Sequence, residues 1–176
     1  MEKGLTHVYT GDAKGKTTAA FGLALRALGR GMRVLVVQFL KGGPDPSGEL
    51  VAISRIPGAE VIRFEDQRHP IFCPECDVKA LRKSINDGLS LARKETMSGG
   101  YDLIVLDEVN NCMSGGWLAP SLVGSLINEK PDSVELVLTG RGCPDDIIAL
   151  ADYVTEMRLV KHPAQVGIMG RLGVEF

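Results

Sequence analysis

Residues 10–18 read Thr-Gly-Asp-Ala-Lys-Gly-Lys-Thr-Thr, and this stretch constrains the fold of the chain most strongly. A Gly-Lys-Thr triplet that ends a loop of small residues is typical of a phosphate cradle. Backbone N–H groups surround the phosphates, the lysine reaches their outer oxygens, and the threonine hydroxyl binds Mg²⁺. The usual motif has glycine where this chain has Thr10, and here Gly11 follows one residue later. The sequence therefore predicts a phosphate cradle of irregular spacing.

The residues on either side of the loop decide whether the motif is real, because Gly-Lys-Thr also occurs by chance. A short β-prone run, residues 6–9, precedes the loop. Gly29 and Gly31 end the helix predicted after it. Apolar residues recur in that helix with the spacing of a broad buried face, at Ala19, Phe21, Leu23, Ala24, Ala27 and Leu28. The order strand, loop, helix favours a cradle to which the helix adds the positive end of its dipole.

Strand-like and helix-like segments alternate along the rest of the chain. Strands are predicted at residues 33–39, 60–64, 103–106, 134–138 and 153–160, with residues 60–64 nearer an edge of the sheet. Helices are predicted after Asp77, from Pro120 and over residues 144–151. The helix after Asp77 has the apolar stripe Val78, Leu81, Ile85, Leu89 and Ala92. This order predicts an α/β fold of the P-loop NTPase-like (RecA-like) class, with a mostly parallel sheet and helices on both faces.

Length, charge and cysteine content narrow the class further. A chain of 176 residues is normally one domain, so we expect a single domain over residues 1–176. The net charge of −2 gives no sign of a nucleic-acid partner. The longest apolar run, residues 34–39, is too short to span a membrane. Four cysteines without a visible signal peptide indicate a reducing, cytoplasmic location.

Charged residues follow two of the predicted buried strands, at the edge where parallel sheets bind ligands. Asp107 and Glu108 follow residues 103–106, where a phosphate-cradle protein carries the acid that organises Mg²⁺. Arg141 lies just beyond residues 134–138 and can neutralise the charge of a phosphate. Simpler interpretations also exist, namely an ordinary charged strand end for the acids and a solvated turn for the arginine.

Blocks spread along the whole chain resemble the ATP:corrinoid adenosyltransferases, the family that makes adenosylcobalamin. They include Val-Gln-Phe-Leu-Lys-Gly at 37–42, Leu-Asp-Glu-Val-Asn at 106–110, Leu-Thr-Gly-Arg-Gly at 138–142 and Val-Lys-His-Pro at 160–163. Residues 9–22, 151–157 and 173–176 complete the set. The displaced first glycine of the cradle is what this family shows, so the resemblance is specific as well as continuous.

The resemblance implies the reaction and its participants. In this family, Co(I) of a reduced corrinoid attacks the 5′ carbon of ATP and triphosphate leaves, in the biosynthesis or salvage of adenosylcobalamin. Because the corrinoid metal is the nucleophile, the protein positions the substrates and stabilises charge. ATP lies reversed relative to nucleotide kinases, with its terminal phosphate deepest in the loop. The resemblance further implies a homodimer and an electron-donating reductase or flavodoxin as a partner.

The residues expected to carry these tasks fall into three groups. Lys16, Glu108 and Arg141 are the expected catalytic residues. Thr17, Asp107 and Glu108 are expected to bind Mg²⁺. The residues expected to contact the nucleotide or the corrinoid are Thr10, Gly11, Asp12, Ala13, Lys14, Gly15, Lys16, Thr17, Thr18, Arg26 and Phe72.

Three features depart from the family pattern. The family usually has glycine in place of Ala13, where a β-carbon can alter the approach of the backbone to phosphate. Some members displace the lower ligand of cobalt with an aromatic-rich turn, and here residues 65–76 offer Phe72 without the full aromatic pair. Pro70 and Pro74 predict an irregular loop, which we expect to be mobile and to order over the lower face of the corrinoid. Some members also carry an N-terminal segment that helps cover the corrinoid, whereas this chain begins almost at its first strand.

Cys73 and Cys76 form a Cys-x-x-Cys pair with three alternative roles. Together with Cys112 and Cys143 they have the residue types of a tetrathiolate zinc site, although only half of its spacing is present. They can also form a redox pair or remain free thiols, and the spacing favours free thiols.

Two other functions remain open at this point. One is a nucleoside or small-molecule kinase of the same fold, in which a zinc-binding lasso would use Cys-x-x-Cys pairs; this chain has one such pair. The other is a non-enzymatic ATP-binding regulatory subunit, favoured if Ala13 disables the cradle. The products distinguish the three functions, because an adenosyltransferase releases triphosphate, a kinase releases ADP, and the regulatory subunit releases neither.

Overall fold

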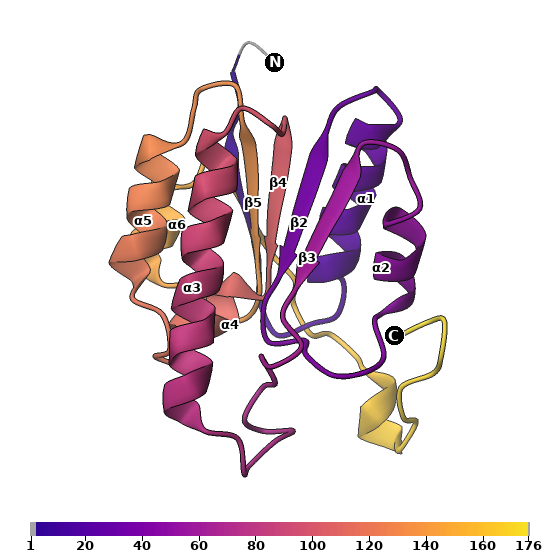
Figure 1. The fold of residues 1–176 in the computed structure, drawn as a ribbon. Coiled ribbons are helices and arrows are strands. Elements are labelled where there is room, and N and C mark those ends of the chain that lie inside the picture. The colour runs from indigo at the N-terminus through magenta and orange to yellow at the C-terminus, as the bar shows by residue number, and fades with distance from the viewer. Residues whose placement is uncertain (1–2, 176) are drawn as a thin grey trace.

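A computed structural model describes residues 3–175 and contains a six-stranded parallel sheet (Figure 1). The strands are β1 (Thr6–Thr10), β2 (Val34–Gln38), β3 (Ala59–Arg63), β4 (Leu103–Asp107), β5 (Glu135–Thr139) and β6 (Tyr153–Glu156). Their order across the sheet is β3-β2-β4-β5-β1-β6, and every neighbouring pair is parallel. The predicted α/β class is confirmed, and so is the edge position of residues 60–64.

Helices cover both faces of the sheet, as the sequence predicts. On one face lie α1 (Lys16–Leu28) and α2 (Gly48–Ile53), and the other face carries the remaining α-helices (Figure 1). Those are α3 (Val78–Met97), α4 (Val109–Ser114), α5 (Pro120–Glu129) and α6 (Asp145–Leu150); a short 3₁₀ helix, η1 (Pro163–Val166), follows β6. Each face has its own core cluster, so the protein has two apolar layers with the sheet between them.

The central strands belong to both layers at once, because successive strand residues point to opposite faces. In β2, Val36 packs in the cluster under α1 and α2, whereas Val37 packs in the cluster under α3. All five residues of β2 and all five of β4 are buried. A strand with two covered faces is expected to be largely apolar, which explains the near-continuous apolar runs in the sequence.

The structure corrects three details of the secondary-structure prediction. It contains two six-residue helices, α2 and α4, that the sequence did not predict. Val78 lies in the first turn of α3 and is 46% exposed, so it does not belong to the buried stripe. The last strand ends at Glu156 rather than at residue 160, because Met157 leaves the sheet edge and bonds to the loop after β1.

None of the helices in the described part of the chain combines the length and the apolarity that crossing a membrane requires.

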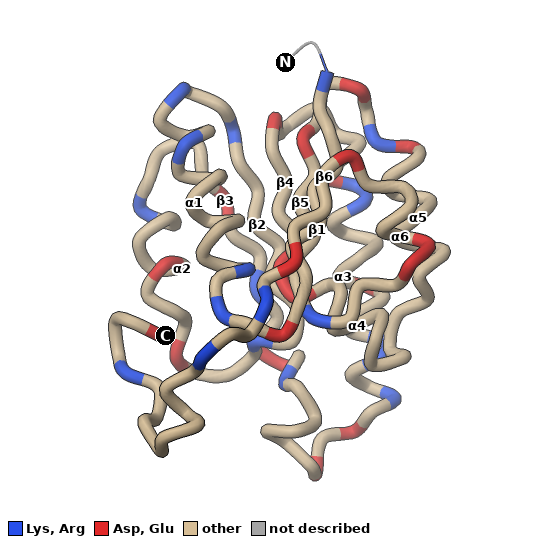
Figure 2. The backbone as a smooth tube through the Cα atoms, turned by 180° about the vertical axis from the view of Figure 1, so that it is seen from behind, with Lys and Arg blue, Asp and Glu red and all other residues tan. Residues whose placement is uncertain are grey.

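The parallel arrangement determines where the site must lie. Since the strands run in one direction, their carboxyl ends meet at one edge of the sheet. The loop after β1, Gln38 of β2, Asp107 of β4 and Thr139 of β5 therefore come together there. The backbone positions of acidic and basic residues lie near one another where these central strands end (Figure 2).

Candidate active site at the carboxyl ends of the strands

The first glycine of the cradle, residues 10–18, is displaced by one position because the backbone of Met157 lies against the start of the loop. Thr10 is still part of β1, where it pairs with Glu156, and its hydroxyl accepts a hydrogen bond from the backbone N–H of Cys143 at 3.3 Å. The turn begins at Gly11, which has a φ of +94°, and a β-carbon at this position would clash with the backbone of Met157. The structure therefore requires glycine at position 11 and accommodates threonine at position 10.

Ala13 adopts a backbone conformation that any L-residue can adopt. Among the described residues, the non-glycine residues with positive φ are Leu40 and Glu108. The backbone N–H of Ala13 donates a hydrogen bond to the carbonyl oxygen of Met157 at 3.0 Å. The alanine thus fits the loop without backbone strain, although the family usually has glycine there.

Lys16 is buried and folds back over the cradle. Its Nζ donates hydrogen bonds to the carbonyl oxygens of Gly11 and Ala13, both at 2.7 Å, and the residue is 8% exposed. Burial lowers the pKa of Lys16, and the nearby charge of Arg141 lowers it further. Glu108 and Asp12 raise the pKa again but do not reverse the shift, and an anion in the cradle would bring further opposite charge to the ammonium group.

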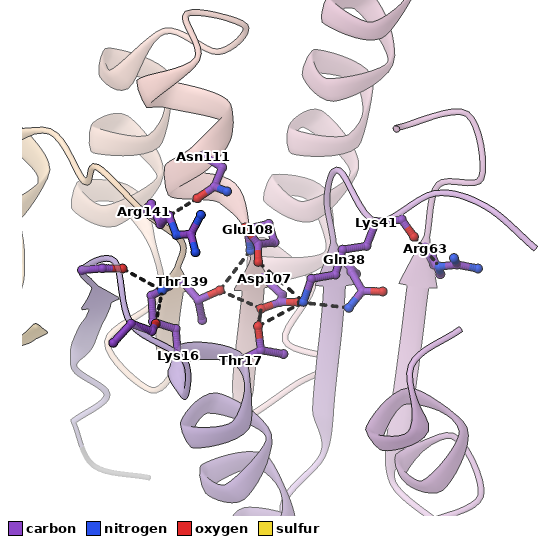
Figure 3. A network of polar contacts seen from close by, with 12 residues as sticks. Lys16, Thr17, Gln38, Lys41, Arg63, Asp107, Glu108, Asn111, Thr139 and Arg141 are labelled. Atoms are coloured by element: carbon purple, nitrogen blue, oxygen red, sulfur yellow. Dashed lines mark hydrogen bonds and ion pairs between the residues drawn. The ribbon is translucent and has the colours of Figure 1, made fainter. Parts of the chain in front are cut away.

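Asp107 is the most completely bonded polar side chain of the site (Figure 3). Its Oδ1 accepts hydrogen bonds from the hydroxyls of Thr139 at 2.7 Å and Thr17 at 2.9 Å. Its Oδ2 accepts from Lys41 at 2.9 Å and from Gln38 at 3.0 Å. Burial raises the pKa of Asp107, but the charge of Lys41 and these bonds outweigh burial and hold the pKa below its usual range. The carboxylate therefore ties β4 to β2, β5 and α1.

Glu108 is held in an uncommon conformation at the start of α4. Its φ is +65°, and its backbone N–H donates a hydrogen bond to the hydroxyl of Thr139 at 3.0 Å. The side chain lines the cavity that the cradle opens into. Burial raises the pKa of Glu108, Lys41 lowers it, and the charge of Asp107 raises it again, with a net upward shift. A second cation near this carboxylate would stabilise its ionised form.

The three residues predicted to bind Mg²⁺ surround one cation in this structure, the ammonium group of Lys41. Its Nζ lies 2.9 Å from Oδ2 of Asp107, 3.0 Å from Oγ1 of Thr17 and 3.6 Å from Oε1 of Glu108. Carboxylate and hydroxyl oxygens are also the donors that Mg²⁺ prefers. These three residues therefore fit a cation. The sequence prediction did not include Lys41, whose ammonium group contacts them.

Arg141 lies at the far side of the cradle. Its backbone N–H donates to the Oδ1 of Asn111, and its Nη2 donates to the carbonyl oxygen of Asp12 at 3.2 Å. The side chain lines the cavity opposite Lys41, as expected for a group that neutralises phosphate. Asn111, from α4, fixes the backbone of this arginine, and no sequence signal identified it.

The cavity above the cradle has a volume of about 850 Å³ and two chemically different walls. One wall carries the charged groups just described. The other is largely apolar and comes from α1, α2 and the turn after α2, with Phe21, Leu25, Ala52, Ile53 and Ile56. Thr18 also lines the cavity, whereas Arg26, exposed in the last turn of α1, does not. A contact of Arg26 with the nucleotide stays a prediction.

The C-terminal tail, residues 171–175, crosses one side of the cavity. Lys14 donates a hydrogen bond to the carbonyl oxygen of Val174 at 2.6 Å and lies 3.4 Å from Oε1 of Glu175. Arg171 holds the same carboxylate and keeps the pKa of Glu175 at about 2. The tail block resembles the family in sequence, and its last residue, Phe176, lies outside the described residues.

Residues 65–76, here called the proline loop, form the opposite rim of the cavity. The loop contains no helix or strand, as predicted, although Arg68 forms an isolated antiparallel β-bridge with Lys41. Phe72 is 85% exposed and lines the cavity, and the ring of His69 packs against Trp117 with 5.4 Å between ring centres. Phe72 is therefore available to a ligand that enters above the cradle.

The cysteines of the proline loop are joined to each other. Cys73 and Cys76 form a disulfide, so the expectation that they are free thiols is wrong for this pair. Cys112, a residue of α4, is buried and Cys143 is half-buried, and both are free. Within residues 3–175, no group of three or more His, Cys, Asp or Glu side chains is placed to hold a metal ion. The tetrathiolate site does not form, because Cys112 belongs to the core while the pair lies at the rim.

The fold and the site together define an α/β protein of the P-loop NTPase-like class, with a cradle, an acidic strand end and an arginine at one cavity. The sequence model of the family described as ATP:corrinoid adenosyltransferase BtuR/CobO/CobP matches residues 2–176. The chain belongs to this family, and the family's activity is that of a transferase.

Relatives with curated names agree with this assignment. The corrinoid adenosyltransferase of Escherichia coli K12 is 35% identical over 99% of this chain and 87% of its own length. The enzyme of the same name from a Sinorhizobium species is 38% identical over 99% of this chain and 81% of its own length. Among solved structures, the cytoplasmic domain of EssC matches 96% of this chain and 34% of that chain, with a TM-score of 0.55 and 14% identity. At this identity the last likeness shows the fold alone.

Proposed function

We propose that this protein transfers the 5′-deoxyadenosyl group of ATP to Co(I) of a reduced corrinoid and releases inorganic triphosphate. Co(I) supplies the electron pair of the new cobalt–carbon bond, and the pair of the broken C5′–O bond leaves with triphosphate. The observation that carries the proposal is the convergence of the cradle, Glu108 and Arg141 on one cavity with an apolar wall. Family membership supports the same reaction.

The residues of the cavity meet the charge of the leaving group. Lys16 exchanges its bonds to the loop carbonyls for bonds to triphosphate oxygens. The exchange places negative charge directly against the buried ammonium group. Arg141 and Lys14 add two further cations at the rim. Because the corrinoid supplies the nucleophile, the chain contributes position and charge stabilisation.

Mg²⁺ is part of the proposal. Thr17 and Glu108, with Asp107, would hold the ion, which neutralises part of the triphosphate charge when bound. Glu108→Ala should therefore lose adenosylation rate, and added Mg²⁺ should restore part of that rate. If the variant kept the wild-type rate at limiting Mg²⁺, Glu108 would have no role in holding the ion.

The setting of the reaction is proposed from the family and from composition. We expect one domain over residues 1–176, a homodimer, a cytoplasmic location, and a reductase or flavodoxin that delivers the electron to cobalt. Phe72 is proposed to contact the lower face of the corrinoid, because it is exposed at the rim of the cavity.

A product analysis tests the reaction. The protein is mixed with ATP, Mg²⁺ and chemically reduced Co(I) corrinoid. Phosphorus NMR should show inorganic triphosphate, and the visible spectrum of the corrinoid should show the cobalt–carbon bond. Lys16→Ala serves as the control for release that the protein does not catalyse. ADP without a cobalt–carbon bond would replace this proposal with a kinase.

A further inference from the structure

Lys41 reaches the acidic site through an unusual turn of the backbone. Leu40, which comes between β2 and Lys41, has a φ of +57°, a conformation that costs energy for residues other than glycine. The carbonyl oxygen of Lys41 accepts a hydrogen bond from Nε of Arg63 at 2.9 Å, and its backbone bridges Arg68. The backbone of Lys41 is thus fixed on both sides, while its side chain is 31% exposed and lines the cavity.

The ammonium group of Lys41 lies among the oxygens that a divalent cation would need. It bonds Asp107 and Thr17 and lies 3.6 Å from Glu108 (Figure 3). The hydroxyl of Thr17 donates its hydrogen to Asp107, and its oxygen accepts a hydrogen bond from Lys41. A metal ion that contacts this oxygen would therefore take the place of the ammonium group. The ammonium and a divalent cation repel each other, so they cannot share this position.

We propose that Lys41 is an exchangeable counter-ion: it neutralises Asp107 and Glu108 in the free protein, and a divalent cation displaces it toward the triphosphate. The inference rests on the proposed function for the identity of the anion. The flexible four-carbon stem of lysine permits this movement from a fixed backbone. The displaced ammonium then adds to Lys16 and Lys14 at the leaving group, since all three side chains line the same cavity.

Calorimetric titrations with Mg²⁺ alone and with inorganic triphosphate test the exchange without any cobalt chemistry. In Lys41→Gln, the amide still donates a hydrogen bond to Asp107 but no longer competes as a charge. The affinity of the free protein for Mg²⁺ should rise about tenfold, and the affinity for triphosphate in the presence of Mg²⁺ should fall about tenfold.

Lys14→Gln is the matched control, because Lys14 lines the same cavity but bonds the C-terminal tail instead of the oxygens that surround Lys41. It should lower the affinity for triphosphate and leave the affinity for Mg²⁺ unchanged. Removal of Lys41 also leaves a buried carboxylate without its cation, so folding is checked by thermal unfolding with and without Mg²⁺. Mg²⁺ should raise the Tm of Lys41→Gln more than that of the wild type.

Two results would overturn the exchange. Equal Mg²⁺ affinity in the wild type and Lys41→Gln would make Lys41 a fixed structural partner of Asp107. Triphosphate binding that is independent of Mg²⁺ in the wild type but requires it in Lys41→Gln would show that the lysine permanently replaces the ion. Neither result depends on adenosylation, so a failure of the proposed reaction would be recognised separately, by the absence of a cobalt–carbon bond.

Discussion

Lys16 and Phe72 line the same cavity, but Lys16 is 8% exposed and Phe72 is 85% exposed. On the side of Lys16, polar groups lie at the ends of buried strands, and Asp107 uses both carboxylate oxygens. Away from Lys16, the rim consists of the proline loop on one side and the C-terminal tail on the other, with apolar side chains in contact with solvent. Ile71 and Leu172 there are 76% and 83% exposed.

The proposed reaction accounts for this difference, because the two sides of the cavity are proposed to bind different ligands. Triphosphate is small and highly charged, and charged groups bind it strongly only when the fold holds them in position and excludes water. An exposed apolar rim is stabilised by a large ligand that covers it, rather than by the fold. Substitutions on the cradle side should therefore change binding or stability strongly, whereas those on the rim should change the corrinoid steps alone.

We expect the largest effect on ligand binding from Lys16→Ala. A small effect would contradict the contrast between the cradle side and the rim of the cavity. Its ammonium is the buried cation at the bottom of the cradle, so ATP affinity should fall at least about a hundredfold. Calorimetry measures the affinity. Lys94→Ala, which removes an exposed lysine from the last turn of α3, is the control and should bind ATP like the wild type. Unchanged affinity in Lys16→Ala would exclude the cradle as the phosphate site.

Asp107→Asn tests whether the acid site also holds the fold together. The substitution places an amide N–H₂ against donors and leaves Lys41 without its closest carboxylate, so unfolding should cost about 2–3 kcal/mol less. Urea unfolding measures the loss. Asp87→Asn removes an exposed carboxylate that pairs with Lys83 on α3 and should leave stability unchanged. A stable Asp107→Asn protein would mean that the four bonds to Asp107 matter for ligands only.

The same contrast explains which parts of the molecule the sequence could predict. Thr17 was predicted from the Gly-Lys-Thr triplet of the cradle. Asp107 and Glu108 were predicted because strand ends of a parallel sheet meet by geometry. Gln38 interrupts an apolar run and could have been assigned to the site by the same rule, since it ends β2 beside Asp107. Lys41 could not, because its place depends on the left-handed turn at Leu40, which no local rule predicts.

Contacts distant in sequence lay beyond prediction for a different reason. Lys14 and Val174 are 160 residues apart, and neither composition nor periodicity connects them. The helices α2 and α4 have six residues each, too short for a repeating apolar pattern. The pairing of Cys73 with Cys76 was one of three open roles, and the sequence favoured a different one.

Phe72→Ala sharpens the comparison from the rim. Because the side chain is 85% exposed, the free energy of unfolding should change by less than about 0.5 kcal/mol. The rate with Co(II) corrinoid and a reductant should fall several-fold, because displacement of the lower ligand makes cobalt easier to reduce. The rate with Co(I) supplied should change little. Val160→Ala, equally exposed but away from the cavity, is the control. If both rates in Phe72→Ala matched the wild type, Phe72 would have no part in corrinoid binding.

Ala13→Gly should have the smallest effect, although it lies in the cradle itself. The family preference for glycine predicts that the change is tolerated or mildly activating. Ala13 has no positive φ and is held by Met157, so glycine relieves no strain and only makes the unfolded chain more flexible. Stability should fall by about 0.5–1 kcal/mol, with ATP affinity within about twofold of the wild type.

Gly11→Ala is the matched opposite, since its β-carbon would meet the backbone of Met157 at a φ of +94°. It should lose both stability and ATP binding, as measured by thermal unfolding and calorimetry. The pair separates two requirements that sequence patterns combine, a glycine for backbone conformation and a glycine for access to phosphate. A large gain in ATP affinity or rate in Ala13→Gly would show that the β-carbon of Ala13 obstructs phosphate. Access of phosphate to the backbone, rather than backbone conformation, would then limit ATP binding at this position.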